Sequence, residues 1–155
     1  MVNNPGKAAG QYAGLPSGFN LRLNKASANT VTRGLVCRID TGTTPDSFTQ
    51  AAATALLAGP FAIPIETKGA GTTEFSARYN DVIYLIADGA IEPYANVTTS
   101  GTTSGKVVAG TATADSMIIG ICLGTAETWN TGAPVAAADE DLVAVYVPLG
   151  GAGLI

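Results

Sequence analysis

The sequence contains no histidine, only two cysteines and few charged residues. Without histidine it lacks the commonest general base and the commonest transition-metal ligand, so a Cys–His nucleophile and a zinc site of Cys/His type are excluded. Charged residues make up 13% of the 155 positions, about half of the usual share. This low share excludes a coiled coil, a charged disordered tail and a nucleic-acid binder that depends on bulk charge.

Long hydrophobic runs are also absent. The longest, Val82–Ala87 and Met117–Leu123, are far shorter than a membrane span. The first thirty residues contain no apolar stretch of the kind found in secretory signals. We therefore expect a protein that is made in the cytoplasm and has no membrane partner.

The charges that are present are unevenly distributed. Residues 1–78 hold seven of the eight basic groups and four acids, a net charge of +3, whereas residues 79–155 hold one basic group and eight acids, a net charge of −7. Such a bipolar chain suits head-to-tail contact between copies, or docking of its basic end on an acidic partner. The alternative is that these are scattered solubilising charges.

A chain of 155 residues buries about two-thirds of its surface on folding, so a core needs neither a metal nor a disulfide. Cys37 and Cys122 both lie inside apolar runs, which is typical of buried, unreactive thiols. A single disulfide between them is the less favoured alternative.

Residues 1–30 are predicted to form an extended arm. Their apolar residues follow neither the spacing of a helix nor that of a strand, and they are rich in Gly, Asn, Ala and Pro. Within the arm, 19–23 alternates and is predicted to pair as an edge strand. An arm of about thirty residues cannot bury itself as a separate core, so we expect it to be partly mobile and to become ordered on a partner. The residues predicted to form that interface are Leu15, Phe19, Leu21, Arg22, Leu23 and Lys25.

Residues 31–155 are predicted to form a single all-β domain, a small β-barrel or β-sandwich. Because proline has no backbone N–H to donate, Pro64 predicts that the strand Phe61–Glu66 lies at the edge of a sheet. Asp88-Gly89 indicates a tight hairpin turn. The tract Thr98–Gly105 is predicted to be a loop. The predicted strands are Leu35–Ile39, Phe61–Glu66, Val82–Ala87, Lys106–Ala109, Met117–Leu123 and Leu142–Val147.

One short helix is predicted between Thr44 and Ala58. Thr44 suits the N-cap and Pro45 the first helical position, and Gly59-Pro60 would end the helix.

No motif carries a strong chemical signal. Asp139–Asp141 lacks the alternating spacing of a calcium loop and is typical of a solvated turn. Ser104 beside Gly105-Lys106 is too short a pattern to indicate a nucleophile. Trp129 either caps one end of the domain or stacks on a sugar, and the cap is favoured. We therefore expect no enzyme activity, no metal and no cofactor.

Four segments in the second half resemble the capsid decoration (cement) proteins of tailed bacteriophages. They are Asn80–Leu85, Asp88–Pro93, Ile118–Leu123 and Thr131–Val135, within a match that covers roughly residues 79–148. The sequence departs from that family's pattern at Asn80, where glycine is usual, and in the additional acids Asp139–Asp141.

The resemblance implies a structural virion protein that is made in the host cytoplasm and binds the outer surface of the capsid. Its partners would be the major capsid protein and, in a homotrimer, further copies of itself. The family has no catalytic residues to carry over. A carbohydrate- or receptor-binding module of a virion fibre is the alternative, and it would bring Tyr12, Tyr94 and Trp129 together on one exposed face.

Overall fold

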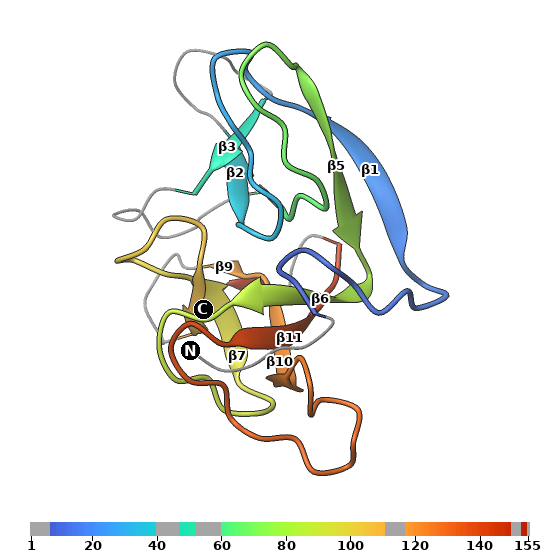
Figure 1. Cartoon of the computed structure of the whole chain (residues 1–155), viewed down its shortest axis with the longest axis vertical. Helices are drawn as coiled ribbons and strands as arrows, with labels where there is room; N and C mark the ends of the chain where they lie inside the picture. Colours follow the sequence, from blue (N-terminus) through green and yellow to red (C-terminus); the bar gives the residue numbers. More distant parts are fainter. Residues whose placement is uncertain (1–6, 40–46, 52–59, 111–116, 150–152, 155) are drawn as a thin grey trace.

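Antiparallel β-strands make up the regular structure of this protein, and the all-β prediction is confirmed (Figure 1). The computed structural model describes residues 7–39, 47–51, 60–110, 117–149 and 153–154. Within these ranges no helix is long and apolar enough to cross a membrane. The strands are β1 (Phe19–Asn24), β2 (Cys37–Ile39), β3 (Phe48–Gln50), β4 (Phe61–Ala62), β5 (Glu74–Tyr79), β6 (Asp81–Ile86), β7 (Asn96–Thr99), β8 (Val107–Ala109), β9 (Met117–Ile118), β10 (Gly120–Thr125), β11 (Leu142–Val147) and β12 (Gly153–Leu154).

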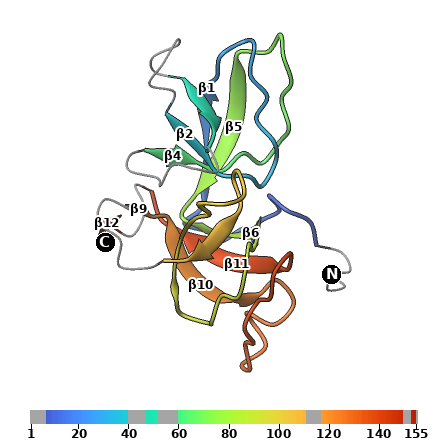
Figure 2. The ribbon, with the colours of Figure 1, turned by 90° about the vertical axis from the view of Figure 1, so that its left-hand side faces the viewer.

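The largest sheet has five strands in the order β6-β11-β10-β7-β8. A ribbon of β1 and β5 and a small sheet in the order β3-β2-β4 form the other half of the molecule, and β12 pairs with β9. Figures 1 and 2 show β1–β5 stacked above the five-stranded sheet. The arrangement is sandwich-like and does not close into a barrel within the described residues.

The strands β6 and β11 are buried on both faces, which explains their continuous apolar sequences. Because successive side chains alternate between faces, Ile83, Leu85, Val143 and Val145 join the main core. The intervening side chains join a second cluster on the opposite face, made of Val82, Tyr84, Ala126, Leu142 and Ala144.

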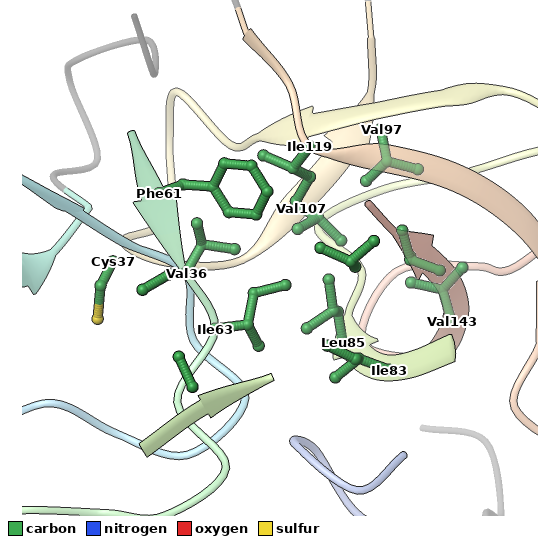
Figure 3. Packing of buried hydrophobic residues seen from close by; sticks show 14 of the residues in the cluster. Val36, Cys37, Phe61, Ile63, Ile83, Leu85, Val97, Val107, Ile119 and Val143 are labelled. Atoms are coloured by element: carbon green, nitrogen blue, oxygen red, sulfur yellow. The ribbon is translucent and has the colours of Figure 1, made fainter. Parts of the chain in front are cut away.

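The main core lies between the five-stranded sheet and the segments that carry β2 and β4. Figure 3 shows Val36, Phe61 and Ile63 from one side meeting Leu85, Val107 and Ile119 from the other. One apolar cluster therefore joins the two halves of the molecule.

The helix prediction is wrong where it can be compared with the structure. Phe48–Gln50 forms the strand β3 and pairs with β2, and the remainder of Thr44–Ala58, except Ser47 and Ala51, lies outside the described residues. Phe48 is buried against Phe75, with ring centroids 6.1 Å apart. This long-range packing overrides the local helix propensity.

The hairpin prediction at Asp88-Gly89 is also wrong. Gly89 does have a positive φ of 118°, but β6 pairs with β11, far along the chain, and not with the residues that follow the turn. The Asp88 carboxylate instead accepts hydrogen bonds from the hydroxyls of Ser100 and Thr102, which lower its pKa. The edge-strand prediction for Phe61–Glu66 holds only for β4, which covers Phe61–Ala62 at an edge of its sheet. Pro64 lies beyond β4, where it forms a bridge to Ala77 of β5 and its carbonyl accepts from Gly34 N.

Asn80 forms the corner between β5 and β6, where the chain passes from one sheet to another (Figure 1). Its φ is 55°, in the left-handed region that glycine adopts most easily and that Asn tolerates. The backbone N–H of Asn80 donates to the Val147 carbonyl at 2.7 Å, and its side-chain Oδ1 accepts from Leu149 N at 2.9 Å. A glycine would adopt this backbone conformation without strain.

Gly120 lies at the start of β10, close against β11. A Cβ at this position would lie 2.2 Å from the Tyr146 carbonyl oxygen. We expect Gly120→Ala to destabilise the protein by about 1–3 kcal/mol, because backbone of the central sheet must move. Urea denaturation measures the change. The control is Gly101→Ala, where a Cβ meets nothing within 4 Å, and equal effects of the two substitutions would contradict this account.

Cys37 and Cys122 are both buried and free, as the sequence predicts. Burial raises the pKa of Cys37 to about 12, so its thiol stays protonated at neutral pH. We expect a thiol reagent to label neither cysteine in the native protein and both in urea. Because the unfolded thiol ionises near pH 8.5, stability should fall as the pH rises from about 8.5 towards 12. Rapid labelling of the native protein would disprove this prediction.

Candidate functional site

Residues 10–13 of the N-terminal segment lie along the free edge of β6 and extend the five-stranded sheet (Figure 2). Gly10 N donates to the Tyr84 carbonyl at 2.8 Å, Tyr84 N donates to the Gln11 carbonyl at 2.9 Å, and Ala13 N donates to the Val82 carbonyl at 2.9 Å. An uncovered sheet edge is a template for pairing with another chain, so this segment protects β6.

The Asp81 carboxylate holds the end of that segment in place. Asp81 is fully buried, and its oxygens accept hydrogen bonds from Gly14 N at 3.0 Å and from Leu15 N at 3.1 Å. Arg78 donates to it from Nε at 3.0 Å and from Nη2 at 2.8 Å, and Val82 N donates at 2.7 Å. The buried charge is therefore both neutralised and hydrogen-bonded, as such a group requires.

Arg78 connects this ion pair to the rest of the N-terminal segment. Its guanidinium carbon lies 4.3 Å from the centroid of the Tyr12 ring, and its Nη1 donates to Asn20 Oδ1 at 3.0 Å. A Cβ at Gly18 would lie 2.4 Å from Arg78 Nη2 and 2.8 Å from Asp81 Oδ2. A glycine is thus required where the chain passes over the ion pair.

The strand β1 pairs with β5 through one edge, and among the described residues no strand pairs with its other edge over Phe19–Leu23. A bridge from Lys25 to Phe48 lies just beyond its end. Lys25 N donates to the Thr73 carbonyl at 2.9 Å, in the register that sets Leu23 opposite Phe75. Because pairing alternates along antiparallel strands, the backbone groups of Asn20 and Arg22 point away from β5. This open edge, together with the exposed side chains beside it, is the candidate docking surface.

The six residues predicted to form an interface take different positions. Leu15 packs on the second cluster, and Phe19 and Leu23 pack on the main core, so these three are half-buried against the chain's own body. Leu21 and Arg22 are exposed. The division of the chain into an arm and a domain at residue 30 stays a prediction.

Lys25 differs most from an exposed interface cation, because it is only 2% exposed. Its ammonium donates to the carbonyls of Ala26 at 2.9 Å and Asn29 at 2.6 Å. Burial lowers its pKa. In this structure Lys25 closes a turn of its own chain.

Arg22 extends over the outer surface of the ribbon between two acids. Its Nη1 lies 3.2 Å from Glu66 Oε1, and its Nε lies 3.6 Å from Glu74 Oε2. Exposed pairs of this kind contribute little stability. Arg22 is therefore free to exchange partners when another surface approaches.

The other candidates do not form a chemical site. Ser104 Oγ donates to the Ala51 carbonyl at 2.5 Å, and no group of acids and cysteines in the described ranges is placed to hold a metal ion. Trp129 packs on the second cluster, Tyr12 lies against Arg78, and Tyr94 is 71% exposed. Among the described residues, no ring contact joins any two of these three aromatics.

No family model and no curated protein sequence matches this chain. Among solved structures, the chain is similar to the N base of head fiber gp8.5 in bacteriophage phi29, with 12% identity and a TM-score of 0.54. The similarity covers 86% of this chain and 98% of that chain. This protein has the fold of that head fiber base. The specific resemblance to capsid decoration proteins stays a prediction.

Sequence reasoning missed the Asp81–Arg78 ion pair. The spacing of an Arg and an Asp three residues apart was visible, but the partners that make it important are Gly14 and Leu15, 67 and 66 residues away. The glycines at positions 14 and 18 were the available signal, because Gly14 has a positive φ of 84° and Gly18 lies where a Cβ would meet the ion pair.

Proposed function

We propose that this protein is a non-enzymatic structural protein of a phage virion, which binds the outer surface of the capsid and stabilises the shell. The observation that carries the proposal is the fold shared with the head fiber base over nearly the whole length of that chain. The low share of charged residues supports it, because a broad interface then forms without burying unpaired ions.

The surface proposed to meet the capsid is the open edge of β1 with Leu21 and Arg22. An exposed strand edge offers backbone hydrogen bonds to an added strand, and the side chains next to it supply specificity. The partner would be the major capsid protein, and a trimer of this chain would place three such edges around one position of the lattice.

The test mixes the purified protein with capsid shells that lack it and measures co-sedimentation. We expect saturable binding to the shells, and Leu21→Asp should weaken it by about tenfold or more, because a charge would be buried at the interface. The matched control is Val135→Asp, a change at another exposed apolar residue, 52% exposed and away from β1. An absence of binding to any shell would refute the proposal, and equal effects of the two variants would refute the docking surface.

Shell stability gives a second measurement. A protein that binds only the assembled lattice stabilises it by mass action. Shells carrying the protein should therefore open at a higher temperature than bare shells in a calorimetric scan. Identical transitions would exclude a cement role while leaving attachment intact.

The second candidate function is a fibre module that binds a carbohydrate or a receptor, and the likeness to a head fiber favours it. The exposed Tyr94 is the aromatic residue most available for such contacts. A glycan-array signal that Tyr94→Ala abolishes, without any binding to shells, would support this function over the first.

A further inference from the structure

An open cleft of about 450 Å³ lies where the N-terminal segment crosses β6. Its size is within the usual range for sites that bind small ligands or peptide side chains. It is separate from the proposed docking surface on β1. The lining residues are Lys7, Gln11, Tyr12, Ala13, Arg33 and Tyr84.

The cleft holds two cations and no acid. Lys7 Nζ lies 3.2 Å from the Tyr84 hydroxyl and 4.9 Å from the centroid of its ring. The stem of Arg33 lies on Gly10, where a Cβ would be 2.3 Å from Arg33 Cγ and 3.2 Å from Arg33 Nε. A residue other than glycine at position 10 would therefore push Arg33 out of the place it occupies beside the cleft.

These two cations differ from the other basic residues that the structure describes. Four of the other basic residues form ion pairs with carboxylates: Arg22, Lys68, Arg78 and Lys106. Lys25 and Arg38 donate to backbone carbonyls of their own chain. In the described ranges neither Lys7 nor the Arg33 side chain has a carboxylate within ion-pair distance. The cleft thus concentrates positive charge that the fold does not neutralise.

The number of cations limits the kind of anion that fits. Nucleic acid is held by many phosphate contacts, commonly six to ten in specific complexes, and anionic membranes attract clusters of four to eight basic residues. This cleft offers two, too few to hold a long polyanion on a chain whose net charge is −4. One or two carboxylates match it, because Arg pairs with a carboxylate through two parallel hydrogen bonds.

We propose that this cleft is a binding site for an acidic segment of a partner protein. A Glu or Asp side chain of that segment pairs with Arg33, and a second carboxylate or a carbonyl accepts from Lys7 and the Tyr84 hydroxyl. The inference concerns a face other than the open edge of β1 and does not depend on the proposed function, since it needs no capsid.

The test uses the full chain and a blocked tetraglutamate peptide, with a blocked tetraglutamine peptide as the neutral probe. Two-dimensional amide NMR follows the titration. We expect tetraglutamate to shift the signals of Lys7, Gln11, Tyr12 and Arg33, and tetraglutamine to leave them unchanged. Arg33→Gln should weaken binding about tenfold, which corresponds to ~1.4 kcal/mol, and Lys7→Gln should weaken it to a smaller extent.

Lys106→Gln is the matched control, because it removes one positive charge outside the cleft, where Lys106 pairs with Glu140. Equal weakening by Lys106→Gln would mean that only overall charge is sensed, and the proposal would fall. Stronger shifts with inorganic phosphate or a single-stranded oligonucleotide would overturn the assignment to carboxylates. Self-association that Arg33→Gln abolishes would support the site and identify a second copy as the partner. Retained signal dispersion verifies that each variant is folded.

Discussion

Replacing Asp81 by Asn should lower the free energy of unfolding by about 3–5 kcal/mol, the usual cost of removing one partner from a buried ion pair. The amide keeps the size of the carboxylate but leaves the Arg78 guanidinium without its counter-charge. Asn also presents an NH₂ group where the carboxylate accepts from Gly14 N, Leu15 N or Arg78. The change is measured by urea denaturation followed by tryptophan fluorescence.

The control is Asp139→Asn, which removes the same charge at an exposed position and should change stability by less than about 0.5 kcal/mol. If the two variants unfold at the same urea concentration, Asp81 does not hold the N-terminal segment as described. If Asp81→Asn also frees that segment, its amide protons should exchange faster than those of β11.

Deleting residues 2–18 is expected to destabilise the protein and make it self-associate. The deletion removes three backbone hydrogen bonds to β6 and both N-terminal donors to Asp81, at about 0.5–1.5 kcal/mol for each bond. It also uncovers an apolar strand edge. Sedimentation velocity at micromolar concentration should show species larger than those of the intact chain.

A point variant separates the loss of pairing from the loss of the segment. Ala13→Pro removes the N–H that donates to the Val82 carbonyl, whereas Ala13→Ser keeps it at the same exposed position. We expect only the proline variant to lose stability, by about 1–3 kcal/mol. If the chain that lacks residues 2–18 keeps the stability of the intact chain and sediments as a species no larger than it, the contacts of residues 10–13 are incidental.

The sequence was most informative where strands are buried on both faces. The strand β11 runs from Leu142 to Val147, as its uninterrupted apolar run predicts, and β6 differs from its predicted range by one residue at each end. These strands carry their signal in their own side chains. The ends of such runs are clear because turn residues bound them.

Strands that depend on distant partners were not predictable in the same way. The strand β5 reads Glu-Phe-Ser-Ala-Arg-Tyr, with small and polar residues between its buried Phe75 and Tyr79, and it is stabilised by pairing with β1. Thr98 and Thr99, predicted to lie in a loop, belong to β7 and are buried. Because their side chains are polar, the sequence gives no sign that they belong to an inner strand of the sheet.

The candidate site was predicted only in part, for a related reason. Alternation identified β1 as an edge strand, and of the six residues predicted to form an interface the structure leaves Leu21 and Arg22 exposed. Which of the alternating side chains would find the core depended on β5 and on the main core, which no local pattern specifies. The buried position of Lys25 follows from two carbonyls in the turn after it, and an isolated lysine in a sequence gives no sign of such partners.

The pairing of residues 10–13 with β6 has a consequence for synthesis on the ribosome. Gly14 and its partner Asp81 are 67 residues apart, so at about 5–20 residues per second the N-terminal segment waits roughly 3–13 seconds before its partner is made. During that interval it needs to stay soluble without a fold, and its Asn, Gly and Pro residues serve this need. The N-terminal segment is therefore made well before β6, the strand whose edge it covers.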